Sequence, residues 1–144
     1  MVPDSIDWQI IHILRKENDS NRAIAEKLGV SEGMVRQRLK RLKDAGILTV
    51  RALINPETLE NQQLALIAVN VTAPDLLETK AQEISRLPNV LAVSIISGRY
   101  DIMVELLVDS NRGLVQFLTG TLSKVKGIST TESFVMLKCY NKYV

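Results

Sequence analysis

Two amphipathic helical patterns separated by only three residues are the feature that most constrains the fold of this chain. They occupy Ile24–Leu48, which reads IAEKLGVSEGMVRQRLKRLKDAGIL. Gly29 predicts the end of the first helix, because glycine adopts the left-handed stop conformation at little cost. Ser31 is a good N-cap for the second helix. Two helices joined by a short turn that contains glycine form a helix-turn-helix.

Another helix is predicted before this pair. Apolar residues recur at helical spacing and predict one buried stripe, made of Ile6, Ile10, Ile13 and Leu14. His12 falls on the opposite face and is assigned no role, and Trp8 is expected to pack against another segment. The helices of the pair are expected at about residues 21–28 and 31–45, the first capped by Ser20 and the second ended by Gly46.

Positive charge is concentrated in the second helix of the pair. Residues 31–51 contain six Lys/Arg and two Asp/Glu, whereas residues 52–144 contain eight and nine. A buried stripe of Val35, Leu39 and Leu42 leaves the basic side chains on the other faces. A basic second helix is typical of a recognition helix that enters the DNA major groove, and a helical hairpin buried in a core would not explain its charge. The residues expected to contact DNA are Ser31, Gly33, Arg36, Gln37, Arg38, Lys40 and Arg41.

The rest of the chain predicts alternating strands and helices. The β-branched run Leu48–Ile54, followed by Asn55-Pro56, predicts a strand and a turn that connect two domains. After it, strands are expected at 64–72, 90–97, 101–108 and 128–139, and helices at 74–87 and 109–125. This βαββαβ order is that of a ferredoxin-like sandwich, in which helices cover one face of an antiparallel sheet. We therefore predict an α+β chain with a winged-helix-like helix-turn-helix domain at 1–48, a linker at 49–62 and a ferredoxin-like domain at 63–144.

The predicted strands are apolar on both faces, which a sheet covered on one face does not require. Leu64–Val69 reads LALIAV, and Ile102–Val104 and Leu106–Val108 are similar. No spare helix is available to cover the open face. We therefore expect a second copy of the sheet to cover it, giving a homodimer through the C-terminal domain. Each domain is also small enough for an isolated core to be marginal.

Composition argues against several other classes of protein. A single cysteine, Cys139, excludes an internal disulfide framework, and one histidine with one cysteine argues against a His/Cys metal site. No apolar run is long enough for a transmembrane helix and no signal peptide is apparent, so we expect a soluble, cytoplasmic protein. No paired carboxylates, nucleophile–base pair or Gly-rich phosphate loop is apparent. We therefore expect neither enzymatic activity nor a cofactor.

In this order and spacing, the segments resemble the Lrp/AsnC (feast/famine) family of prokaryotic transcriptional regulators over essentially the whole chain. The similarity lies in four segments: Asp4–Asp7, Ser20–Ser31 (SNRAIAEKLGVS), Val35–Leu42 with Gly46-Ile47, and the loop Ser97–Asp101. Gly33 departs from the pattern, because glycine is a poor helix former near the start of a recognition helix.

The resemblance implies a dimer that binds pseudo-palindromic double-stranded DNA and assembles further into tetramers or octamers. It also implies a free amino acid bound between dimers. Gly98 would offer backbone N–H groups to its carboxylate and Asp101 would meet its ammonium, although a plain hairpin turn is the alternative interpretation of this loop. The effector residues implied are Gly98, Arg99, Tyr100, Asp101, Thr131 and Ser133.

Two other functions stay open at this point. The first is an architectural DNA-organising protein that ignores small molecules. The second is an enzyme of the same fold that resembles the haem-pathway decarboxylases, and against it stands the lack of cofactor ligands in this chain.

Overall fold

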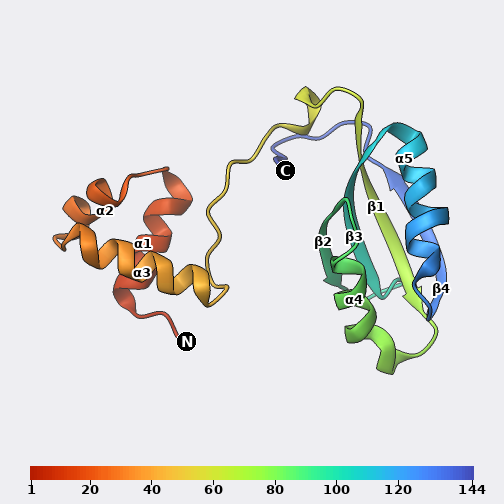
Figure 1. Cartoon of the computed structure of the whole chain (residues 1–144), viewed down its shortest axis with the longest axis horizontal. Coiled ribbons are helices and arrows are strands. Elements are labelled where there is room, and N and C mark those ends of the chain that lie inside the picture. Colours follow the sequence, from red (N-terminus) through yellow and green to blue (C-terminus); the bar gives the residue numbers. More distant parts are fainter. The chain divides into compact units, whose positions relative to one another are not determined.

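Three helices form the N-terminal part of the chain, and a four-stranded sheet with its helices forms the rest (Figure 1). The computed structural model describes all residues, 1–144. The chain divides into two units, Met1–Ala52 and Leu53–Val144, and each is described by itself. The division falls inside the connector predicted at 49–62. None of the helices is both long and apolar enough to cross a membrane.

The N-terminal unit contains helices only: α1 (Ser5–Lys16), α2 (Asn21–Leu28) and α3 (Glu32–Asp44). All three predicted helices are confirmed. Ser20 and Ser31 cap α2 and α3, because each hydroxyl accepts a hydrogen bond from the backbone N–H three residues on, at 3.2 Å. Gly29 follows α2 in the left-handed conformation, with φ +67°, and so makes the turn between the two helices possible.

The core of this unit is aliphatic. Its buried cluster consists of Ile10, Ile24, Ala25, Val35 and Leu39, against which Ile6, Ile13 and Leu14 pack. The predicted stripe of α3 is confirmed, since its third member, Leu42, is also buried. Trp8 is instead 57% exposed, contrary to the expectation that it packs against another segment.

The strand predicted at Leu48–Ile54 is wrong. Residues 48–55 have no regular structure. Ile54 exchanges two backbone hydrogen bonds with Val144, at 2.8 and 3.0 Å, but no other residue of the run pairs with a neighbouring strand. A strand needs a partner along its length to satisfy its N–H and C=O groups, and the chain supplies none here.

The C-terminal unit has the predicted βαββαβ arrangement. Its elements are β1 (Gln62–Val71), α4 (Leu77–Ser85), β2 (Val90–Ile95), β3 (Ile102–Asp109), α5 (Ser110–Gln116) and β4 (Ile128–Val135). All neighbouring strands are antiparallel, in the order β2-β3-β1-β4. Ile84 of α4 and Phe117, just beyond α5, are buried in one cluster with Ile67 and Val104 of the central strands. The helices therefore cover one face, and the ferredoxin-like prediction is confirmed.

Two elements of this unit end earlier than predicted. The helix expected to reach Val125 changes after Gln116 into a π-helical turn and then a 3-10 turn. The hydroxyl of Thr119 donates to the Val115 carbonyl at 2.8 Å, and such bonding disturbs the helical ladder. The last strand ends at Val135 rather than Cys139. The next carbonyl, that of Met136, accepts from the Gln63 side chain at 2.8 Å, where the chain leaves the sheet.

The face of the sheet away from the helices is apolar, as predicted, but the chain covers part of it. Its apolar residues in the two central strands are Leu64, Leu66, Ala68, Met103 and Leu107, all buried or half-buried. The C-terminal segment returns to this face, where Lys142 forms an ion pair with Glu105 of β3. A single chain therefore leaves less of this face open than the strand pattern suggests.

Candidate nucleic-acid interface

The residues predicted to contact DNA lie on α3 and at its N-cap. The structure leaves all of them exposed except Arg38, namely Ser31, Gly33, Arg36, Gln37, Lys40 and Arg41. Nη2 of Arg36 lies 2.7 Å from Oε1 of Glu32, but 70% of the Arg36 side chain is exposed. Such a surface pair contributes little to stability and is readily exchanged for a contact with DNA.

Arg38 and Arg41 are bound to two acidic residues at the start of the chain. Nη1 of Arg38 lies 2.7 Å from Oδ2 of Asp4 and 2.8 Å from Oδ1 of Asp7. Nη2 of Arg41 lies 3.0 Å from Oδ2 of Asp7. The Asp7 side chain is fully buried, whereas that of Arg38 is 20% exposed and that of Arg41 52% exposed. Arg38 is therefore engaged inside the unit, and Arg41 is engaged only in part.

Asp4 and Asp7 also cap α1. Oδ1 of Asp4 accepts the Asp7 backbone N–H at 2.9 Å, and Oδ2 of Asp7 accepts the Asp4 backbone N–H at 3.1 Å. This reciprocal pair is a capping box, with carboxylates at the positive end of the helix dipole. The buried carboxylate of Asp7 thus has both backbone and guanidinium partners, as a buried charge requires.

These contacts favour the charged form of each group. The hydrogen bond from Arg38 lowers the pKa of Asp4 below its usual value. Burial by itself would raise the pKa of Asp7, but the Asp4 backbone N–H and the Arg38 guanidinium outweigh it, so that pKa is lowered. The two carboxylates raise the pKa of Arg38. The cluster of Asp4, Asp7, Arg38 and Arg41, here called the acid–arginine cluster, is therefore ionised at neutral pH.

Asp7 is the residue of this region whose role the sequence reasoning missed. It precedes Ile10 by about one turn and so lies beside the buried stripe of α1, where an acid needs a partner. The spacing of Asp4 and Asp7 at a helix start also matches the capping-box pattern. Both signals are local, but the arginine partners meet Asp7 only when α3 packs on α1.

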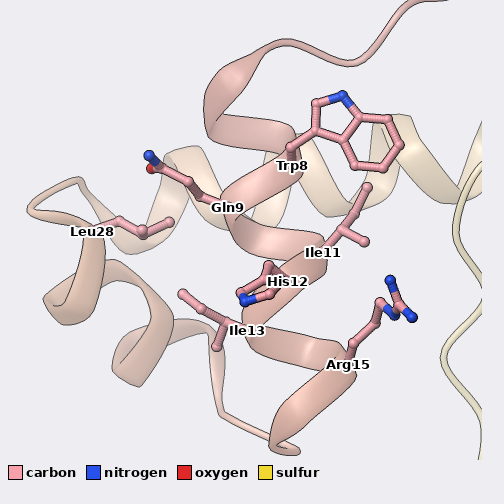
Figure 2. A pocket seen from close by; sticks show the side chains of 7 residues that line it. All are labelled: Trp8, Gln9, Ile11, His12, Ile13, Arg15 and Leu28. Atoms are coloured by element: carbon pink, nitrogen blue, oxygen red, sulfur yellow. The ribbon is translucent and has the colours of Figure 1, made fainter.

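An apolar hollow of ≈ 440 Å³ lies on α1 and contains none of the predicted DNA-binding residues. Figure 2 shows Trp8, Ile11 and Arg15 along one side of α1, with Leu28 of α2 at the far margin. His12 also lines the hollow and makes no hydrogen bond or ion pair within the chain. The hollow therefore adds apolar surface to α1 but no chemistry to the basic face of α3.

The loop between β2 and β3 contains the predicted effector residues Gly98–Asp101. The Arg99 guanidinium lies 5.6 Å from the centre of the Tyr100 ring. Asp101 anchors the loop to β1, because its Oδ2 accepts the Val71 backbone N–H at 2.9 Å. Its own backbone N–H donates to the Val69 carbonyl at 3.1 Å. Oδ1 of Asp101 has no partner within the chain.

Thr131 and Ser133 lie on β4 and are not brought to this loop within one chain. They pair with Val69 and Ile67, whose side chains enter the helix-covered core, so both lie on the helix-covered face. Thr131 lines a hollow of ≈ 250 Å³ that contains no loop residue.

Two polar side chains that the sequence reasoning missed do reach the loop. Oδ1 of Asn70 accepts the Asp101 backbone N–H at 3.1 Å, and Nδ2 of Asn70 donates to Thr130 Oγ1 at 3.0 Å. Asn70 is a lone amide near the end of the otherwise apolar strand β1, and that isolation is the signal that could have identified it.

Comparison with known proteins gives matches to both units. The family model described as Lrp/AsnC ligand binding domain matches residues 64–143, and that described as winged helix-turn-helix DNA-binding matches residues 3–49. The chain is 35% identical over 135 residues to an uncharacterised HTH-type transcriptional regulator of Pyrococcus furiosus, covering 92% of this chain and 90% of that protein. It is 30% identical over 141 residues to the HTH-type transcriptional regulator FL11 of the same organism, covering 96% and 92%.

A solved structure is similar over almost its whole length. It is a transcriptional regulator of Neisseria meningitidis in complex with L-Met, with a TM-score of 0.73 and 26% sequence identity. The match covers 99% of this chain and 94% of that chain.

Proposed function

We propose a regulatory mechanism for this chain, which belongs to the Lrp/AsnC family of DNA-binding transcriptional regulators. The helix-turn-helix binds double-stranded DNA through the exposed face of α3. A free α-amino acid bound at the C-terminal unit changes the assembly or its affinity for DNA. The observation that carries this proposal is the surface of α3, which is basic, exposed and capped by Ser31 directly after the glycine turn.

The exposed residues of α3 are assigned to base and phosphate contacts by their position. Arg36 and Gln37 lie in the N-terminal half of α3, the part that reaches base edges in this motif, where arginine suits guanine and glutamine suits adenine. Lys40 lies one turn further along and suits a phosphate. A Cβ at Gly33 would meet no atom within 4 Å, so packing within the unit does not require glycine there. A close approach of the backbone to DNA would explain it.

The proposed effector site lies beside the loop Gly98–Asp101, between two dimers. The family description of this unit as ligand-binding and the bound L-Met of the Neisseria relative support the choice of an amino acid. Oδ1 of Asp101 would accept from the α-ammonium, and backbone N–H groups near Gly98 would bind the α-carboxylate. Since Thr131 and Ser133 lie on the other face of the same sheet, any contribution from them comes from a neighbouring subunit.

The proposed assembly follows from the open face of the sheet. A second copy covers the apolar side chains that stay half-buried there, including Leu66 and Met103. The resulting two-fold axis relates two α3 helices and matches a pseudo-palindromic site in cytoplasmic DNA. Dimers then assemble into tetramers or octamers.

The test is a thermal-shift screen of the purified chain with each standard amino acid, followed by DNA binding with and without the best ligand. A ligand that binds only the folded form stabilises it by about 2.7 kcal/mol at 100 times its Kd. The proposal expects at least one amino acid to raise the melting temperature and to change DNA affinity or assembly. If DNA binds but no amino acid has either effect, the architectural role replaces the regulatory one.

A further inference from the structure

The carboxylate of Asp7 connects two arginines of α3 that differ in what they have left to offer. Arg38 makes hydrogen bonds to both Asp4 and Asp7 and is 20% exposed. Arg41 makes one, to Asp7, and is 52% exposed. A guanidinium presents a fixed fork of several N–H donors, so Arg41 keeps donors that point away from the carboxylate. Of the two arginines, Arg41 alone has free donors at an exposed position.

Arg41 also lies at the margin of the proposed DNA-binding face. It follows Gln37 by four residues on α3, and residues four apart lie on the same side of a helix. Gln37 and Lys40 are both exposed. A phosphate contacted by Lys40 or approached by Gln37 is therefore next to Arg41.

Fixing an arginine before it binds reduces the entropy lost on binding, because a long flexible side chain otherwise loses rotamer freedom in the complex. Oδ2 of Asp7 is buried and also accepts the Asp4 backbone N–H at 3.1 Å, so it is a rigid anchor. The hydrogen bond from Arg41 to this oxygen, at 3.0 Å, therefore fixes the guanidinium.

We propose that Asp7 is a positioning residue for DNA binding: it holds the Arg41 guanidinium so that its free N–H groups bind a DNA phosphate, while Arg38 stays inside the unit as a structural anchor. This inference rests on the assignment of α3 as the recognition helix. It adds one phosphate contact per chain and removes Arg38 from the predicted set of contacts.

The charge of Asp7 makes the inference testable by the sign of an effect. Replacing Asp7 by Asn removes a negative charge from a DNA-binding unit, and electrostatics alone then predicts tighter, more salt-dependent binding. Loss of positioning predicts the opposite result. Affinity should fall about tenfold, the lower end of what one charge-assisted hydrogen bond contributes. The slope of log K against log salt should shrink by roughly 0.9, the value for one phosphate contact per chain.

Asp4→Asn is the matched control. It removes the same charge from the same acid–arginine cluster, and asparagine is as good an N-cap as aspartate. Asp4 contacts Arg38 but makes no hydrogen bond to Arg41. The control should therefore bind DNA as tightly as the wild type or more tightly.

The experiment measures binding to a duplex selected from a random-sequence pool with the wild-type protein, over a range of salt concentrations. Wild type, Asp7→Asn, Asp4→Asn, Arg41→Ala, the double variant Asp7→Asn/Arg41→Ala and Lys40→Ala are compared after circular dichroism shows folded protein. If Asp7 acts through Arg41, Asp7→Asn should cause no further loss of affinity in the Arg41→Ala background. A general structural effect would lower affinity in both backgrounds and would contradict the proposal.

Two further results separate the possible failures. If Lys40→Ala and Arg41→Ala both leave the salt slope unchanged, the assignment of α3 itself is wrong. If Lys40→Ala lowers the slope but Asp7→Asn raises affinity, only the positioning role is wrong. Should Asp7→Asn not fold, Arg41→Lys replaces it, because lysine keeps the charge but loses the fixed fork. Positioning predicts a smaller slope for that variant, and an unchanged slope and affinity would overturn it.

Discussion

The two units of the chain keep their folds with different kinds of contact. The C-terminal unit has an aliphatic and aromatic core around Ile67, Val104 and Phe117. The N-terminal unit has a smaller apolar core and adds Asp7, the one buried charged residue of the chain. In the sheet, the backbone ladder sets the register, so core side chains need mainly to fill space. Three helices have no ladder between them, and side chains alone decide how they pack.

The acid–arginine cluster therefore has a task that no group in the sheet needs to perform. Apolar contacts between helices tolerate small rotations, whereas hydrogen bonds from Arg38 and Arg41 to Asp7 are directional. They connect the start of α1 to the second half of α3. An orientation specified in this way matters most for an element that must present side chains to a partner, and α3 is that element.

The largest expected effect tests the apolar side of this comparison. Phe117→Ala removes a ring that is 2% exposed and should destabilise the C-terminal unit by about 4 kcal/mol, through lost burial and the cavity left behind. The N-terminal unit should unfold as before. The chain's single tryptophan, Trp8, lies in the N-terminal unit, so its fluorescence in a urea titration reports that unit while circular dichroism reports both. A matching shift in the Trp8 transition would contradict independent units.

The next effect tests the polar side. Arg38→Met keeps the aliphatic stem but leaves Oδ1 of Asp7 buried without its partner, which should destabilise the N-terminal unit by roughly 3 kcal/mol. Arg36→Met is the matched control on the same helix. Its exposed pair with Glu32 should matter by less than about 0.5 kcal/mol. Both are read from the Trp8 transition in urea, and equal losses in the two variants would show that the cluster is not a special source of stability.

Acid should weaken the N-terminal unit through the same cluster. The pKa values of Asp4 and Asp7 are lowered in the folded chain, chiefly by the Arg38 hydrogen bond for Asp4 and despite burial for Asp7. A lowered pKa stabilises the fold above the unfolded value of about 3.9, and this stability is lost as the pH falls through the folded value. The urea midpoint of the Trp8 transition should therefore fall steeply below about pH 4. Asp7→Asn should flatten that fall, and an identical pH profile for both proteins would assign it to other carboxylates.

Elements with strong local signals could be predicted from the sequence. The caps Ser20 and Ser31 and the stop at Gly29 define α2 and the start of α3, because each acts within one turn of its own position. Residues 48–54 could not be placed, since their β-branched composition favours extended backbone without supplying a partner strand. The end of β4 depends in the same way on Gln63, which lies 73 residues earlier.

The candidate site divides along the same line. Helical periodicity identifies the exposed residues Arg36, Gln37 and Lys40, because exposure on a helix follows from its buried stripe. Arg38 could not be separated from them. A basic residue on the flank of a helix has the same local pattern whether it faces solvent or a buried acid 31 residues earlier. Thr131 likewise lies on a predicted strand, but only the register shows which face it occupies.

The smallest effect on stability is expected at the polar contacts of the C-terminal unit, which lie at its surface around Asp101. Asp101→Asn keeps an oxygen that can accept the Val71 N–H, now at 2.9 Å from Oδ2, so unfolding should change by less than about 1 kcal/mol. The substitution removes the charge that the α-ammonium of an effector would meet. A charge-assisted hydrogen bond contributes about 1.5–3 kcal/mol, so effector affinity should fall by roughly one to two decades. DNA affinity without effector should stay unchanged, because the loop belongs to the other unit.

Calorimetry of wild type and Asp101→Asn with the best amino acid from the screen measures this loss, and sedimentation with and without ligand measures its effect on assembly. The two readouts are linked: a ligand can shift an assembly only by as much as its affinity differs between the two states. Weaker binding should therefore move the sedimentation shift to higher ligand concentration without changing its size at saturation. Equal affinities for both proteins would remove Asp101 from the site. A changed assembly in the absence of ligand would mean that Asp101 acts through its contacts with Val71 and Asn70 on the end of β1, and the comparison between a polar N-terminal unit and an apolar C-terminal one would then need a second exception.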